Sequence, residues 1–321
     1  MKRPRRNRRS HAIRSMVQET TLSPADLVAP LFVVPGHKRK EELEKLPHVF
    51  RYSIDQLLIE AEALHKKGLP AIALFPVISS EEKDLLGSEA LREEGIIPQA
   101  IKAIKKEIPS LCVITDIALD PFTSHGHDGI VGENREVDND RTVEILAQMA
   151  LLHGSCGADF VAPSDMMDGR VRAIRQRLDA HAKHEVGILA YTAKFASSLY
   201  GPFRDTLGSK LSFGDKRGYQ MNPANVREAL LEATLDAEEG ADILMVKPGL
   251  FYLDIIAKIR ETLHLPICAY HVSGEYAMVI AAHEKGYLDA KATFLEGLLC
   301  MKRAGADFIL SYAAPLLLDD L

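Results

Sequence analysis

The sequence predicts an α/β protein, a closed (β/α)8 TIM barrel preceded by an extended N-terminal arm. Eight apolar, β-branched segments alternate with amphipathic segments as far as the C-terminus, and no low-complexity linker divides them. No Gly-x-Gly-x-x-Gly motif follows any of these segments, which disfavours an open dinucleotide-binding sheet. We therefore predict an arm at residues 1–28, for oligomer contacts, and a single catalytic barrel at residues 29–321.

The arm is rich in arginine and has no acidic residue before Glu19. So short and basic a segment has too little apolar surface to fold alone, and we interpret it as an arm that contacts a neighbouring subunit. An organelle transit peptide and a nucleic-acid-binding tail are alternatives with the same composition. The whole chain has a net charge of −6, which argues against a general attraction to nucleic acid or to anionic membranes.

The strands of the barrel are expected where short apolar runs end in polar residues. Three of them follow a repeated Gly-Ala-Asp step, which we expect to close one helix and to open the next strand. Amphipathic periodicity predicts helices at 54–67, 142–153, 226–239 and 253–263. Strands are predicted at 29–34, 71–76, 112–118, 159–163, 187–192, 243–246, 267–271 and 308–312.

The cysteines and the hydropathy pattern indicate a soluble cytoplasmic protein. Cys112, Cys156, Cys268 and Cys300 are far apart without CxxC spacing, so we expect buried free thiols in a reducing compartment. No uninterrupted apolar run approaches membrane-spanning length, and no apolar signal core follows the basic N-terminus.

Two lysines follow apolar strands and are the strongest functional signal. Lys194 ends the run GILAYTAK, and Lys247 lies near the end of ADILMVKPG. The carboxyl ends of barrel strands form the mouth of the active site, where a lysine is desolvated and lies near another cation. Both effects favour the neutral amine, which can form an imine with a ketone. One such lysine is typical of an aldolase, whereas two predict an enzyme that activates two carbonyl substrates side by side.

The segment 195–221, after the fifth strand, is expected to form a lid. It is rich in glycine, shows little helical periodicity and carries Arg204, Lys210, Lys216 and Arg217. Because arginine binds carboxylates through two parallel hydrogen bonds, a cationic lid predicts a substrate with a carboxylate.

Metal-binding signals are weaker. His125 and His127 beside Asp128 could form a ligand cluster, but a hydrolytic zinc site needs further histidines, so we favour hydrogen-bonded structural histidines. Asp120 and Asp128 are hard oxygen donors that would suit Mg²⁺ better than zinc.

Five motifs resemble those of the δ-aminolevulinic acid dehydratases, or porphobilinogen synthases, and the resemblance covers essentially the whole chain. It implies a homo-octamer, possibly in exchange with smaller assemblies, that condenses two molecules of 5-aminolevulinate to porphobilinogen with loss of two waters. The motifs are DIALDPFTSHGHDG (116–129), PSDMMDGR (163–170), YTAKFASSLYGPFR (191–204), GADILMVKPG (240–249) and VSGEYAM (272–278).

The resemblance also implies catalytic roles. Lys194 and Lys247 match the two lysines that form imines with the substrates. Asp116 lies inside the third strand, where a buried carboxylate could transfer protons during imine chemistry, and Ser164 is a second candidate for proton transfer.

Substrate-binding residues follow from the same resemblance. Ser273 and Tyr312 match the residues that hold one substrate's carboxylate. Arg204, Lys216 and Gln220 match the lid groups that hold the other. Lys216 stands where many members have arginine, which keeps the charge but loses the bidentate geometry.

The metal positions depart from the zinc-dependent members of the family. Those members carry three cysteines where this chain has Ala118, Asp120 and Asp128. Because alanine cannot bind a metal and zinc prefers thiolates, we predict no catalytic zinc and an aspartate-rich, magnesium-responsive type. Glu232 matches the family's allosteric Mg²⁺ ligand at a subunit interface.

The residues alone leave three alternatives open. A class I aldolase or synthase barrel would use one lysine, and a metal-dependent barrel hydrolase would use His125 and His127. A non-catalytic or nucleic-acid-binding barrel would use the basic arm.

Overall fold

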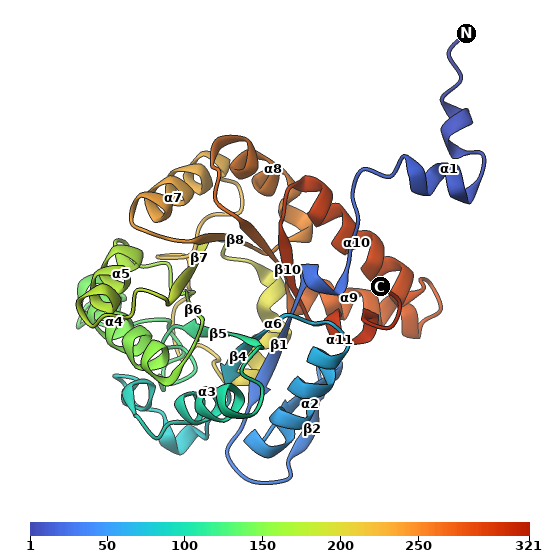
Figure 1. The fold of residues 1–321 in the computed structure, drawn as a ribbon. Helices are drawn as coiled ribbons and strands as arrows, with labels where there is room; N and C mark the ends of the chain where they lie inside the picture. The colour runs from blue at the N-terminus through green and yellow to red at the C-terminus, as the bar shows by residue number, and fades with distance from the viewer.

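Eight parallel strands form a closed barrel in this computed structural model, which describes residues 1–321 (Figure 1). Each strand pairs with the next along the chain, and pairing between the last and the first closes the barrel. The predicted fold is confirmed, and every predicted strand lies within two residues of its observed bounds. The strands are β1 (Leu27–Val33), β4 (Ala71–Pro76), β5 (Cys112–Ile117), β6 (Phe160–Pro163), β7 (Gly187–Lys194), β8 (Ile243–Lys247), β9 (Ile267–His271) and β10 (Phe308–Ser311).

Helices surround the barrel between successive strands (Figure 1). All four predicted helices are present, and α4 is longer than predicted at both ends. It begins earlier because the Asp138 carboxylate accepts the backbone N–H of Arg141 and caps the helix, and it ends at Gly157, whose φ is 107°. The helices are α2 (Ile54–Lys66), α3 (Ile96–Glu107), α4 (Asn139–Cys156), α5 (Arg170–Ala180), α7 (Val226–Glu238), α8 (Leu253–Thr262), α9 (Ser273–Glu284), α10 (Ala290–Ala304) and α11 (Ala314–Leu317).

A hairpin between β1 and α2 was not predicted. Its strands are β2 (Lys40–Leu43) and β3 (Leu46–Tyr52), which pair antiparallel, and β3 also pairs with the end of β1. The charged start of this segment hides the pattern, because Glu41 binds Arg39 and Arg51 through ion pairs instead of following an apolar run.

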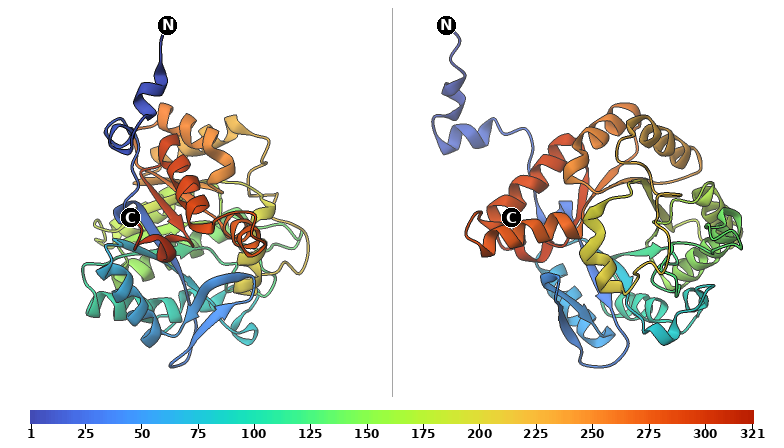
Figure 2. Two further views of the ribbon diagram at one scale, coloured as in Figure 1. Left: turned by 90° about the vertical axis from the view of Figure 1, so that its right-hand side faces the viewer. Right: turned by 180° about the vertical axis from the view of Figure 1, so that it is seen from behind.

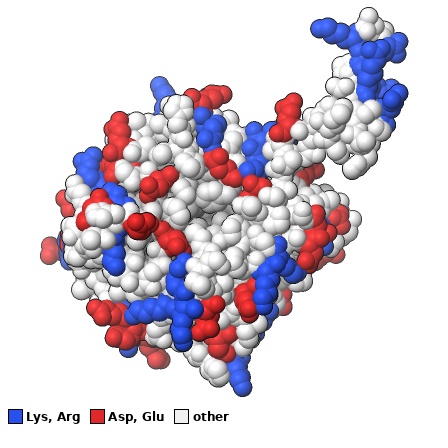
Figure 3. Space-filling view, viewed as in Figure 1, with Lys and Arg blue, Asp and Glu red and all other residues white.

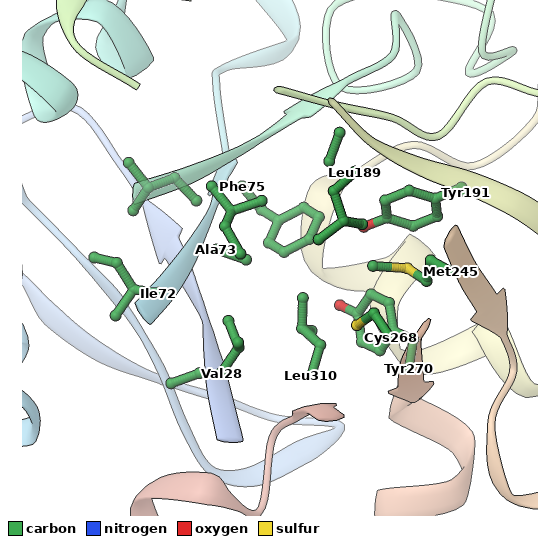
Figure 4. Close-up of a cluster of buried hydrophobic side chains, with 14 of the residues drawn as sticks. Val28, Ile72, Ala73, Phe75, Leu189, Tyr191, Met245, Cys268, Tyr270 and Leu310 are labelled. Carbon is green, nitrogen blue, oxygen red and sulfur yellow. The ribbon is translucent and has the colours of Figure 1, made fainter. Parts of the chain in front are cut away.

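Apolar side chains fill the inside of the barrel (Figure 4). Val28, Phe75 and Leu310 are among those that meet there, and Tyr191 and Tyr270 reach in from β7 and β9. The barrel is therefore a packed core rather than a pore, and chemistry is confined to its ends.

The three Gly-Ala-Asp steps act as clamps at the amino ends of strands. In each step the aspartate's backbone N–H donates to the carbonyl of a residue on the preceding strand, and its carboxylate accepts the N–H of that same residue. The pairs, with their carboxylate–nitrogen distances, are Asp159 with Val113 (2.7 Å), Asp242 with Ile188 (2.8 Å) and Asp307 with Ile267 (2.7 Å).

The arm projects away from the barrel (Figures 1 and 2). It contains a 3₁₀ turn at Pro4–Arg8 and helix α1 (His11–Met16), neither of which has a buried residue. Basic side chains crowd the arm, whereas charges of both signs are mixed over the face of the barrel in view (Figure 3).

All four cysteines are free, but the prediction that they are buried is wrong for three of them. Only Cys268 is buried, because it lies in β9. Cys112 begins β5, Cys156 ends α4 and Cys300 lies within α10, and all three are half-buried. None of the helices combines the length and the apolar character needed to cross a membrane.

Candidate active site

The carboxyl ends of β7 and β8 place Lys194 and Lys247 side by side. Each is the last residue of its strand, and the two are paired in register. Both side chains are only about 6% exposed. The sequence-based expectation of two neighbouring, desolvated amines is thus met in the structure, but the two amines have different surroundings.

The amine of Lys247 lies in an aromatic box and forms no ion pair. Its nitrogen is 4.4 Å from the ring centre of Tyr270 and 5.0–5.3 Å from those of Tyr191, Phe203 and Tyr200. Burial, together with the charge of Lys194, lowers the pKa of Lys247 to about 7. A large fraction of this amine is therefore neutral and nucleophilic near neutral pH.

The amine of Lys194 is held by oxygen atoms. Its nitrogen lies 3.2 Å from the Asp128 carboxylate and also donates to the carbonyl oxygen of Ser164. Asp128 is 0% exposed and also binds the lid residue Lys216 at 2.6 Å. Burial would raise the pKa of Asp128, but the two ammonium groups hold it well below its usual range. An ammonium in an ion pair must lose its proton before it can attack a ketone. The first step of imine formation therefore differs between the two lysines.

Asp116 is a buried carboxylate in β5. Burial and the nearby carboxylate of Asp120 raise the pKa of Asp116 to about 7, although Lys247, Lys194 and a hydrogen bond from Ser164 oppose the shift. A group with this pKa can both accept and release a proton near neutral pH. The structure therefore brings both predicted proton-transfer residues together beside the lysines.

Ser273 and Tyr312 flank the aromatic box around Lys247. The Tyr312 hydroxyl lies 3.0 Å from that of Tyr270. The Ser273 hydroxyl accepts the backbone N–H of Phe203 at 3.2 Å. Since Tyr270 and Phe203 both line the box, this predicted carboxylate-binding pair lies on the Lys247 side of the mouth.

The lid carries the second predicted set of carboxylate-binding residues. Lys216 is buried, 2.6 Å from Asp128 and 3.4 Å from Asp120, and the Gln220 amide donates to Asp128 at 3.4 Å. The half-exposed guanidinium of Arg204 lies 5.7 Å from the ring centre of Tyr200. Lys216 and Gln220 thus converge on Asp128, while Arg204 packs against an aromatic ring.

The lid contains a short helix that its low helical periodicity did not indicate. A 3₁₀ turn (Ser198–Tyr200) leads into helix α6 (Gly201–Leu207), which lies over the barrel mouth (Figure 2, right). The helix is too short to show periodicity in the sequence. It is fixed from outside instead, because Lys83 donates to the carbonyls of Leu207 (2.9 Å) and Gly208 (3.1 Å) at its C-terminus.

The histidines of the first motif, DIALDPFTSHGHDG, hold neighbouring segments together. His127 contacts the Tyr219 hydroxyl at 3.1 Å and the Phe213 carbonyl at 3.2 Å, and His125 lies 3.3 Å from the carbonyl of Leu85. No group of three or more His, Cys, Asp or Glu side chains is arranged to hold a metal ion. The hydrogen-bond contacts of both rings are those expected of structural histidines.

Glu232 lines a separate pocket of about 550 Å³ between α7, the lid and the loop after β6. Burial raises the pKa of Glu232 to about 7, and the carboxylates of Asp236, Asp168 and Glu228 act in the same direction while Arg170 opposes them. The pocket therefore concentrates negative charge around one half-buried carboxylate.

A (β/α)8 barrel with two adjacent buried lysines at its mouth, one in an aromatic box and one in an ion pair, defines an imine-forming enzyme. Comparison with known families narrows this class, since the family model for delta-aminolevulinic acid dehydratase matches residues 1–319. The chain belongs to this family and is a lyase.

Relatives agree along nearly the whole chain. The dehydratase of Chlamydia pneumoniae is 54% identical over 318 residues, covering 99% of this chain and 96% of the relative. The chloroplastic enzyme of Oryza sativa subsp. japonica is 50% identical over 314 residues, covering 98% of this chain and 74% of the relative. The crystal structure of porphobilinogen synthase from Toxoplasma gondii, in complex with its product porphobilinogen, has a TM-score of 0.98 and 48% identity, covering 100% of this chain and 92% of that one. The single-lysine aldolase and the metal-dependent hydrolase are not favoured by these matches.

Proposed function

We propose that this chain condenses two molecules of 5-aminolevulinate to porphobilinogen, with loss of two waters, through imines on Lys194 and Lys247. The observation that carries the proposal is the pairing of the two buried lysines in register at the barrel mouth. Each imine releases one water, so two imines account for both waters. The C–N bond of the pyrrole forms when the amino group of one substrate displaces a lysine from the imine carbon of the other. The C–C bond forms when the enamine adds to the remaining imine, and that lysine then leaves as an amine while a ring carbon loses a proton and a C=C bond forms.

The neutral amine of Lys247 reacts without first losing a proton, and Ser273 and Tyr312 hold the carboxylate of its substrate. Arg204, Lys216 and Gln220 hold the carboxylate of the substrate on Lys194. The contact of Lys216 with Asp120 is the longer of its two, at 3.4 Å. Lys216 can therefore turn from Asp120 toward that substrate while it remains in contact with Asp128.

Asp116 acts as the base. An imine acidifies the adjacent C–H, and removal of that proton gives the enamine that attacks the second substrate. The hydrogen bond from Ser164 orients the Asp116 carboxylate. Holding two reactants in such a site can lower the barrier by several kcal/mol, toward the ~7–11 kcal/mol available to well-oriented pairs.

The proposal includes no catalytic zinc. Ala118 offers no ligand, and the ammonium group of Lys216 contacts both Asp120 and Asp128, so a cationic side chain already balances these carboxylates. Glu232 fits Mg²⁺ better, because Mg²⁺ binds through one or two carboxylates and keeps several waters. A cation there would relieve the repulsion among the carboxylates of that pocket, which supports a stimulatory role in a magnesium-responsive enzyme.

Assembly as a homo-octamer, in exchange with smaller forms, is also part of the proposal. The projecting arm and the exposed Leu231 and Leu235 on α7 leave surface for neighbouring copies. Light scattering of the full-length chain measures this mass directly. The four free cysteines fit a reducing compartment, and we propose the cytoplasm, with no nucleic-acid or membrane partner.

Pyrrole formation from 5-aminolevulinate, read with Ehrlich's reagent, tests the proposed reaction. In buffer with Mg²⁺ and a zinc-selective chelator, we expect colour at the same rate as without the chelator. Colour that disappears and returns only on adding zinc would contradict our interpretation of Asp120 and Asp128. Absence of colour in every buffer, from folded protein, would contradict the reaction itself.

The pH dependence separates the roles of Lys247 and Asp116, which both have a pKa near 7. Imine formation needs the neutral amine of Lys247, so borohydride trapping at Lys247 should fall about tenfold for each pH unit below 7 and level off above it. Turnover also needs Asp116 as the carboxylate, so it should fall more steeply than trapping as the pH is lowered. Parallel slopes for trapping, measured by peptide mass spectrometry, and for turnover would contradict the assignment of Asp116 as the base.

A further inference from the structure

Glu275, in the first turn of α9, is a buried carboxylate without a cation. Its side chain is 0% exposed and forms no ion pair. One carboxylate oxygen accepts the backbone N–H groups of Leu250 (2.8 Å) and Phe251 (3.3 Å), and the other accepts that of Val272 (2.8 Å). Burial raises the pKa of Glu275 to about 7, against the opposing effect of these backbone hydrogen bonds, and an acidic group kept in so unfavourable a position indicates a specific demand for its hydrogen bonds.

These hydrogen bonds join two segments that carry the site. Leu250 lies three residues after Lys247, in the loop that leaves β8, and Val272 immediately precedes Ser273 at the start of α9. The loop packs closely on β9 at this point, since a Cβ at Gly249 would lie 3.1 Å from the carbonyl oxygen of Tyr270. Glu275 thus fixes the lysine that forms the imine relative to the serine beside it.

The same turn of α9 is also seated on the lid. A Cβ at Gly274 would lie 2.6 Å from the carbonyl oxygen of Leu199, so only glycine allows this approach. The hydroxyl of Ser273 donates to that carbonyl at 3.2 Å and accepts the N–H of Phe203, whose ring lines the box around Lys247. Movement of this turn would therefore shift the lysine loop, the serine and one wall of the aromatic box together.

We propose that Glu275 is a positioning residue. It fixes Lys247, Ser273 and the start of the lid relative to one another, so that the site is preorganised for the substrate bound on Lys247. The inference rests on the proposed function, because it assumes an imine on Lys247 and a substrate carboxylate at Ser273.

The variant Glu275→Gln tests this role with the least change in shape. An amide has one oxygen acceptor, so its NH₂ group must face either the amides of Leu250 and Phe251 or that of Val272, and one segment is released. We expect a roughly 10- to 100-fold loss of kcat/KM, because small misplacements of reacting groups have effects of this size. The concentration of 5-aminolevulinate that half-saturates borohydride labelling of Lys247 should rise, and the pH midpoint of labelling should move upward as water reaches the amine.

The matched control is Glu284→Gln, which makes the same change at an exposed position at the end of the same helix and should behave as the wild type. Hydrogen exchange in the wild-type enzyme gives a test that does not depend on the variant folding. The amides of Leu250 and Phe251, at the start of a 3₁₀ turn, and of Val272, at the N-cap of α9, should be protected although N–H groups at these positions have no acceptor within their own helix.

Two outcomes overturn the inference: a folded Glu275→Gln enzyme with wild-type kcat/KM and pH midpoint, or rapid exchange of those three amides in the wild type. A wild-type enzyme that 5-aminolevulinate and borohydride do not label at Lys247 would instead contradict the proposed function. The failures of the two proposals are therefore distinguishable.

Discussion

Replacing Lys247 with methionine should reduce turnover by roughly 10⁴-fold or more, because the substrate then loses both its covalent link and its fixed position. Methionine is close to lysine in length, and its sulfur makes favourable contacts with aromatic rings, so it should fill the box formed by Tyr191, Tyr200, Phe203 and Tyr270. The loss of activity should therefore come without a loss of structure.

The same substitution should stabilise the fold. Burial lowers the pKa of Lys247 from 10.5 in the unfolded chain to about 7 in the folded enzyme, so folding disfavours the protonated form. The resulting destabilisation is fully present below pH 7 and disappears as the pH rises from 7 to 10.5. Lys247→Met removes it, and we expect a gain of up to about 4 kcal/mol in the free energy of unfolding at pH 7.

Urea denaturation and the pyrrole assay, run on the same preparations, measure both effects. Lys258→Met, at an exposed position on α8, controls for loss of a lysine as such and should change neither quantity appreciably. An inactive Lys247→Met that is also less stable than the wild type would contradict our account of the aromatic box. An active Lys247→Met would contradict the imine.

The contrast between the two lysines shows what the sequence could not reveal. Both end apolar strands, and that pattern correctly places them side by side in the barrel mouth. Their different surroundings depend on side chains from distant segments. The box around Lys247 includes Phe203 from a helix too short to be predicted, and the ion pair of Lys194 comes from Asp128 in the loop after β5.

The same distinction holds for the fold. Buried strands such as β7 and β9 are continuous apolar runs, so their positions can be predicted from the sequence. The position of the hairpin of β2 and β3 is not predicted by the sequence, because its first strand is charged and Glu41 on that strand forms an ion pair with Arg51 on the second. Glu275 was also missed as a functional residue, although its motif was noted, because a glutamate in the first turn of a helix is ordinarily an exposed capping group.

Replacing Asp128 with asparagine should destabilise the enzyme by about 3–5 kcal/mol at neutral pH, because the buried ammonium group of Lys194 loses its ion-pair partner and that of Lys216 keeps only its longer contact with Asp120. Asp128 contacts Lys194 at 3.2 Å and Lys216 at 2.6 Å, and neither lysine can reach solvent readily. Asp254→Asn on the exposed face of α8 removes the same charge and should have little effect.

The pH dependence of this loss has a definite sign. The folded-state pKa of Asp128 lies below its value in the unfolded chain, so its stabilising contribution is present above the unfolded pKa of about 3.9 and is lost as the pH falls toward the folded value. The wild type and Asp128→Asn should therefore differ most near neutral pH and converge in strong acid. A constant difference from pH 7 to pH 2 would mean that the asparagine acts through packing and not through charge.

A second substitution distinguishes the contribution of Asp128 to the stability of the fold from its contribution to holding the lid. Lys216→Met in the Asp128→Asn background removes the second buried ammonium group, which then has only its longer contact with Asp120, so part of the lost stability should return, whereas Lys216→Met alone should destabilise. If the stability changes of the two single variants simply add, Asp128 stabilises the enzyme through Lys194 alone, and other contacts hold the lid. If they couple, the carboxylate that neutralises the imine lysine also closes the lid, and substrate binding at Lys194 must disturb both.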